Sequence, residues 1–180
     1  MVALAAACAF SACSDDDDDD DSPIITSSSS FKGTSKASVA TVTIPMEDDV
    51  VTVAPMEKDK KMAQLTFAAR KMTIKMGPAD MNVKMDPAAM NVEMDAFTID
   101  SCIVSGSADN YQLKRENPFS VSGVKVSVSM FPGGSEQTVT GTLSSANLAD
   151  GVLTVKLDNV KAHENMPMTM SISFEGQLSK

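Results

Sequence analysis

The sequence has very few of the residues that usually carry catalysis or covalent cross-links. Among its 180 residues there is no tryptophan, one tyrosine, one histidine and three cysteines. Two of the cysteines, Cys8 and Cys13, lie in an apolar leader, so Cys102 is the single cysteine of the rest of the chain and an intramolecular disulfide is excluded there. Stability must therefore come from a packed core, which about 150 residues can form as one domain.

The few candidate catalytic residues have no partners in sequence motifs. His163 lies in Ala162-His163-Glu164-Asn165, interpreted as a surface loop between the last two strands. Cys102 lies in a strand-like, apolar context and would need a histidine partner to act as a nucleophile. The chain contains no Gly-x-Ser-x-Gly elbow and no glycine-rich phosphate loop. These features predict a non-catalytic protein without a cofactor.

The acidic charge of the chain is concentrated in one segment. The chain carries 15 Lys and Arg against 24 Asp and Glu, a net charge of −9. Seven of the acidic residues are consecutive, at 15–21, and without them 17 acidic residues face 15 basic ones, a net charge of −2. The rest of the chain is thus close to neutral, which argues against a nucleic-acid partner. A modest basic cluster is interpreted as a solvated face; it comprises Lys58, Lys60, Lys61, Arg70, Lys71 and Lys75.

The N-terminal segment has the form of a targeting signal. An apolar run at 2–10 ends in Phe10-Ser11-Ala12-Cys13, which resembles the lipobox of bacterial lipoproteins. The run is too short to span a bilayer, which takes about 20 residues, but it suits a signal-peptide core. We therefore expect Cys13 to receive the lipid; Cys8 and an ordinary cleaved signal peptide are the alternatives. Basic residues are missing before the run, which suggests a start codon upstream.

The aspartate run follows the expected lipid site directly. Blocks of like charge repel each other and stay extended, so the run is at least a spacer. Its position also resembles the surface-export signal of Bacteroidetes lipoproteins. The expected organisation is a lipoprotein signal peptide at 1–13, a disordered acidic and Ser-rich tether at 14–30, and a folded domain at 31–180. The expected location is the outer membrane with the domain at the cell surface, anchored in the membrane through the lipid.

Alternation of apolar and polar residues dominates the folded part, which is typical of half-buried strands. The last strand places Met168, Met170, Ile172 and Phe174 on one face. Asp150-Gly151 predicts a hairpin turn. The alternation changes phase at Gly123, which predicts a β-bulge. Phe131-Pro132-Gly133-Gly134 predicts a turn that ends the strand before it.

A nine-residue repeat occupies the middle of the chain. Residues 75–83 repeat as 84–92. The period of nine consists of a five-residue strand of the form Met-x-Val-x-Met, as at 81–85 and 90–94, and four turn residues with Pro in second place. The repeat predicts a meander of three short strands at 71–76, 81–85 and 90–94. Residues 58–76 fit both helical and strand spacing, and strand is favoured.

Roughly ten short strands with turns every 8–12 residues predict an all-β fold, either an antiparallel barrel of roughly 8–10 strands or a two-sheet sandwich. The first strand, opening Phe31-Lys32-Gly33-Thr34, and the closing strands at 151–157 and 166–176 resemble the calycin-like barrel of Bacteroidetes lipoproteins. The resemblance implies a lipocalin-like closed barrel with no established activity.

Three functions remain open at this stage. A barrel of this kind can bind a small apolar ligand, a glycan or a partner protein. It can also have a filled core and act only through its outer surface. The third alternative is a Cu(I) protein that uses thioether ligands, since Met suits soft metals. Because the methionines share faces with Val83, Val92 and Ile74, core packing is favoured and no metal site is predicted; the methionines concerned are Met81, Met85, Met90, Met94, Met166, Met168 and Met170.

Overall fold

The computed structural model describes residues 24–39, 42–76, 88–128, 131–162 and 169–179. These residues form eleven strands and no helix. The strands are β1 (Ser29–Val39), β2 (Val42–Met56), β3 (Asp59–Phe67), β4 (Arg70–Met76), β5 (Ala88–Met94), β6 (Phe97–Ser107), β7 (Asn110–Lys114), β8 (Phe119–Val128), β9 (Phe131–Ala149), β10 (Val152–Lys161) and β11 (Met170–Leu178).

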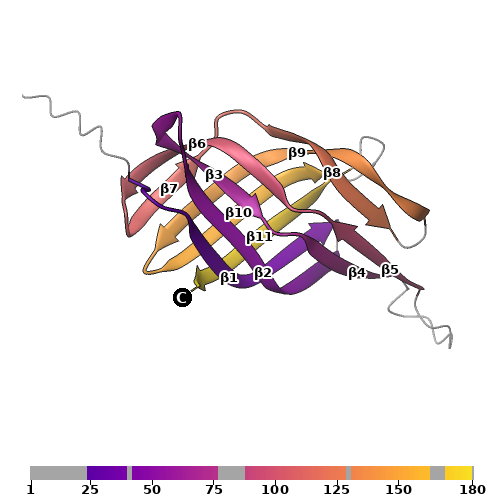
Figure 1. The fold of residues 1–180 in the computed structure, drawn as a ribbon. Helices are drawn as coiled ribbons and strands as arrows, with labels where there is room; N and C mark the ends of the chain where they lie inside the picture. The colour runs from indigo at the N-terminus through magenta and orange to yellow at the C-terminus, as the bar shows by residue number, and fades with distance from the viewer. Residues whose placement is uncertain (1–23, 40–41, 77–87, 129–130, 163–168, 180) are drawn as a thin grey trace, which may run out of the picture.

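Eight of the strands close into an antiparallel barrel (Figure 1). The ring runs β10-β11-β1-β2-β3-β6-β7-β9, and pairing of β10 with β9 closes it. The sequence prediction of a single antiparallel barrel is thereby confirmed, and the sandwich alternative is wrong. The closed ring is consistent with the calycin-like barrel that the sequence resembles.

Three strands lie outside the ring and extend the sheet at one end. β4 and β5 form a hairpin that leaves the barrel wall after β3 and returns to it at β6 (Figure 1). β8 pairs with β5 on one side and with the first half of β9 on the other. The second half of β9 then pairs with β7 and β10 in the barrel. We call β4, β5, β8 and the first half of β9 the side sheet.

The core lies where the alternation predicts it. In β11, Met170, Ile172 and Phe174 are buried, while Ser173 and Glu175 between and beyond them are exposed. β10 buries Leu153, Val155 and Leu157 in the same way. Large side chains from the ring strands are almost completely buried: Phe31, Phe67, Leu65, Ile99, Leu113, Leu153, Leu157 and Ile172. Phe119 at the start of β8 is buried beside them.

The turn and the bulge predicted from glycines are both present. Asp150 and Gly151 have φ angles of 52° and 75° and connect the last pair of β9 with the first pair of β10. These positive angles suit a two-residue hairpin turn. Gly123 has a φ of 77°, and the register of β8 against β9 shifts between Val121 and Val124. This bulge moves the buried face from Phe119 to Val124, as the phase change predicts.

Two local predictions are wrong. Residues 131–134 do not end a strand; they begin β9, and Phe131 pairs with Val128. Pro132 is tolerated because this part of β9 pairs with β8 alone in the described residues, and the register there is irregular.

The three-strand meander is the second wrong prediction. β4 pairs directly with β5, from Arg70 with Met94 to Met76 with Ala88, so the outer repeat units are neighbours. The predicted middle strand at 81–85 lies outside the described residues. The choice of strand over helix for 58–76 is confirmed by β3 and β4.

The ordered chain extends slightly before the predicted start of the domain. β1 begins at Ser29, two residues before Phe31, and Ile25 is buried against the barrel. The segment 24–28 thus forms part of the barrel end near the β6–β7 and β9–β10 turns.

Candidate functional site

A buried polar cluster interrupts the apolar interior of the barrel. Its members are Ser35 on β1, Asp49 on β2 and Arg70 at the start of β4, and they are the three buried polar residues of the described chain. Strand alternation places each of them inward. Asp49 shares its face with Val51 and Val53, and Arg70 shares its face with Met72.

A β-bulge brings Asp49 to this face. Asp48 has a φ of 56°, and β2 carries one more residue than β1 between the pairs Gly33–Asp49 and Ser35–Met46. In a regular strand, residues three positions apart point to opposite faces. The extra residue of the bulge lets the side chains of Met46 and Asp49 both point inward. Asp48 itself points outward and pairs with Lys32 at 2.9 Å.

The contacts of the cluster centre on the Asp49 carboxylate. Its Oδ2 accepts a hydrogen bond from the Ser35 hydroxyl and lies 3.3 Å from Arg70 Nη1. Its Oδ1 accepts a hydrogen bond from the Val50 backbone N–H at 3.0 Å. The side chains of Arg70 and Asp49 are each 3% exposed. The pair is therefore almost fully removed from water.

The Arg70 guanidinium is also stacked on aromatic rings. Its Cζ lies 5.0 Å from the ring centroid of Phe67 and 5.8 Å from that of Phe97. The two rings stack on each other with centroids 5.0 Å apart, and Phe97 continues the stack to Phe119 at 6.3 Å. Aromatic faces stabilise a desolvated cation, by up to about 2 kcal/mol.

Hydrogen bonds compensate only in part for the removal of the Arg70 guanidinium from water. Its Nε donates to the Ala68 carbonyl at 3.5 Å, whereas Nη1 and Nη2 have no hydrogen-bond partner among the described residues. Burial lowers the pKa of Arg70, and the nearby Asp49 charge opposes this effect only in part. The cluster thus holds a charge pair in an apolar setting, where breaking it costs more than forming it gains.

The contacts of this cluster are those of a packed structural element. The Asp49 carboxylate already accepts hydrogen bonds from Ser35 and from a backbone amide, and it forms the ion pair with Arg70. Together with the three stacked rings, the pair fills the region where the β4–β5 hairpin leaves the barrel. We therefore assign it a role in holding the side sheet to the barrel.

The sequence analysis missed this cluster and misplaced Arg70. The interpretation of Arg70 as part of a solvated basic face is wrong, because the side chain points into the barrel; Lys58, Lys61 and Lys71 are exposed, and Lys71 pairs with Glu93 at 2.7 Å. The alternation of β4 does indicate that Arg70 is buried. Arg70 and Met72 lie on the same face of the strand, and a charged side chain on an apolar face requires a buried partner.

The predicted candidate residues are distributed as follows. The lipidation candidates Cys13 and Cys8 and the loop residue His163 lie outside the described residues. Cys102 is fully buried on β6, as predicted, and its thiol donates to the Ile99 and Asp100 carbonyls at 3.9 and 3.7 Å. Burial raises the pKa of Cys102 to about 11, so the thiol stays protonated at neutral pH.

Four of the described methionines are core residues, whereas Met56 and Met62 are half-buried. Met46, Met72, Met94 and Met170 are all buried within the apolar cluster. Met81, Met85, Met166, Met168 and the side chain of Met90 lie outside the described part of the chain. In the described ranges no three His, Cys, Asp or Glu residues come together as a metal site would require.

A shallow polar depression of about 250 Å³ lies on the outer wall over β1, β11, β10 and β9. Lys36, Ser173, Lys156 and Ser145 form one row across these strands, as the register of the strand pairs shows. Lys156 contacts Asp158 at 3.2 Å, and a hydrogen bond from the Ser144 hydroxyl lowers the pKa of the Asp158 carboxyl. This depression is open and lacks an aromatic platform.

Compared with known proteins, the chain matches no protein family, no curated protein and no solved structure. Within the described ranges, the structure contains no helix long and apolar enough to cross a membrane.

Proposed function

We propose that this chain is a lipoprotein of the outer membrane, displayed at the cell surface, whose barrel is a non-catalytic binding module. The membrane attachment rests on Cys13 and the acidic run at 15–21. The barrel itself acts through its surface and its ends, and it carries no ligand in its interior. A partner protein or a glycan is the expected class of target.

The observation that supports surface action is the filling of the barrel. Eight-stranded barrels either hold a small ligand or are filled by their own side chains. Here Leu65, Ile99 and Leu157 inside the ring are almost completely buried. The stacked rings of Phe67, Phe97 and Phe119, with Arg70 over them, fill the end where the side sheet leaves the barrel. A small apolar ligand inside the barrel would have to displace these groups. The alternative of an internal apolar ligand is therefore less favoured.

The two ends of the barrel carry different parts of the chain. Ile24, the first described residue, lies beside Leu178 and the β6–β7 turn at one end. The β4–β5 hairpin projects from the opposite end (Figure 1). If Cys13 is anchored, the side sheet is the part presented away from the membrane, where a partner can reach it.

The anchor is tested by metabolic fatty-acid labelling. We expect label on the wild type and none on Cys13→Ala. Cys8→Ala serves as the matched control and should keep the label. Label that persists in Cys13→Ala, or is lost only in Cys8→Ala, would overturn the anchor assignment.

The filled interior is tested by native mass spectrometry of protein extracted from its own membrane. The expected mass is that of the lipidated chain alone. An apolar molecule without a charged group, retained at a one-to-one ratio and released on unfolding, would contradict the filled barrel and favour an internal ligand.

A further inference from the structure

A pocket of about 220 Å³ opens at the end of the barrel where the described chain begins and ends. Its walls come from the segment before β1, from the β6–β7 and β9–β10 turns, and from the end of β11. The Leu178 backbone N–H donates to the Gly151 carbonyl at 3.4 Å and holds the C-terminal wall against the β9–β10 turn. The apolar part of the lining consists chiefly of Ile24, Ile25, Phe31, Leu148 and Leu178.

Part of this apolar lining is exposed. Leu178 is 53% exposed, one of the few large apolar side chains of the described chain that are not covered. Exposed apolar groups gathered around a hollow are typical of a binding site. Drug-sized ligands occupy pockets of about 300 Å³ or more, so this pocket suits a smaller molecule.

Tyr111 supplies an unused polar group in the pocket. The residue lines the pocket, is only 4% exposed, and burial raises its pKa to about 12. Its hydroxyl therefore stays protonated at neutral pH, and it makes no hydrogen bond with any described residue. The hydroxyl oxygen is not among the buried unpaired polar atoms of the described chain, so it is accessible from the pocket and can bond a polar group of a ligand.

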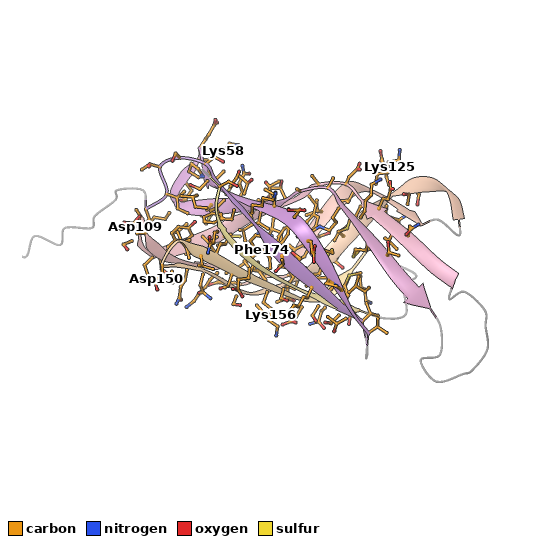
Figure 2. The ribbon with its side chains drawn as sticks, turned by 90° about the horizontal axis from the view of Figure 1, so that it is seen from below. Lys58, Asp109, Lys125, Asp150, Lys156 and Phe174 are labelled. Atoms are coloured by element: carbon orange, nitrogen blue, oxygen red, sulfur yellow. The ribbon has the colours of Figure 1, made fainter. Side chains whose placement is uncertain are left out.

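One carboxylate lines the pocket and a second lies on a neighbouring turn. Asp109 is part of the lining, and Asp150 directly precedes Gly151, which also lines the pocket. Figure 2 shows Asp109 and Asp150 at the same end of the barrel, opposite the end that carries Lys125. Neither carboxylate forms an ion pair with a described residue, and no Lys or Arg lines the pocket in that part of the chain. Two unpaired carboxylates at one end of the barrel repel each other, so a cation near them is favoured.

We infer that this pocket binds a small organic ammonium ion that carries an apolar group. The ammonium lies at Asp109 and Asp150, the apolar group contacts Phe31, Leu148 and Leu178, and the Tyr111 hydroxyl provides a further hydrogen bond. Two carboxylates are too few for a hard metal ion, since Ca²⁺ takes six to eight oxygen ligands. The apolar walls also favour an organic cation. This site lies at the end of the barrel opposite the side sheet, and it does not depend on the lipid anchor.

The test is an NMR titration of the full-length chain carrying Cys13→Ala with 2-phenylethylammonium chloride. We expect saturable shifts of the amide resonances around Tyr111, Leu148 and Gly151. The neutral analogue 2-phenylethanol and the anion 3-phenylpropionate should bind more weakly, in that order. Asp109→Asn and Asp150→Asn should each weaken ammonium binding about two- to fivefold, the effect of one exposed ion pair, and Tyr111→Phe should weaken it without changing the fold.

Glu136→Gln, an exposed acidic residue on the side sheet, is the matched control and should leave the affinity unchanged. Equal affinity for the alcohol and the ammonium would overturn the cation assignment. Shifts that do not saturate, or that spread over the barrel wall, would overturn the site. Saturable binding of CaCl₂ at the same amides would show a metal site in its place.

Discussion

Replacing Arg70 by Met tests whether the buried charge pair holds the side sheet to the barrel. Methionine retains much of the length of the side chain but removes the charge beside Asp49, which then remains buried at 3% exposure. Removing one partner of a buried pair costs about 3–5 kcal/mol. Asp49 keeps its bonds from Ser35 and from the Val50 N–H, so we expect the lower part of that range, about 3 kcal/mol. Loss of the stacking on Phe67 is included in this figure.

The measurement is the free energy of unfolding from urea denaturation, taken around a double-mutant cycle. Asp49→Leu alone should cost as much as Arg70→Met, whereas the double variant should cost far less than the sum, with a coupling of about 2 kcal/mol or more. Lys71→Met is the matched control, because Lys71 and its partner Glu93 are 80% and 53% exposed, and it should cost under about 1 kcal/mol. Additive single effects, or an Arg70→Met variant as stable as the control, would refute the reasoning.

Three further perturbations address the core and its sulfur atoms. Phe174→Ala should lower the free energy of unfolding by about 3–5 kcal/mol, whereas Ser173→Ala on the outer face should change it by under about 0.5 kcal/mol; equal losses would mean that both faces are covered. Cys102 should react with iodoacetamide at pH 8 only in urea, and rapid labelling of the native protein would contradict its burial. Burial raises the pKa of the folded thiol from 9.0 to about 11, so the free energy of unfolding should fall as the pH rises from 9 toward 11. Met72→Leu and Met94→Leu should each cost under about 1.5 kcal/mol, and Cu(I) should not raise the melting temperature of the wild type; a rise that the Leu variants abolish would instead support metal ligation.

The architecture could be predicted because alternation and turn chemistry are local. Ile172 and Phe174 alternate with polar neighbours, and Asp150-Gly151 forms the turn expected of it. The predicted meander was wrong because a nine-residue repeat gives the length of its units but not the order in which they pair. Pro132 was misread as a turn residue because the sequence does not reveal that its strand is paired on one side only there.

The buried cluster depends on contacts between residues distant in sequence. Ser35 and Asp49 are 14 positions apart, and a bulge at Asp48 changes the parity that would link Asp49 to Met46. The position of Arg70 on the apolar face of its strand indicates that its side chain is buried, but nothing in the local sequence identifies Asp49 as its partner. The pocket at the barrel end likewise joins residues 24 and 178, and nothing in either local sequence indicates the other.

The pairing of β1 with β11 has a consequence for the time course of folding. Phe31 lies opposite Leu178, so the first and last strands of the barrel are hydrogen-bonded neighbours. Contacts of such large sequence separation form late and slowly, because the chain between them must be ordered first. During synthesis the ring cannot close until β11 has left the ribosome, and β1 keeps an unpaired edge until then. An unpaired strand edge of this kind exposes the incomplete barrel to aggregation.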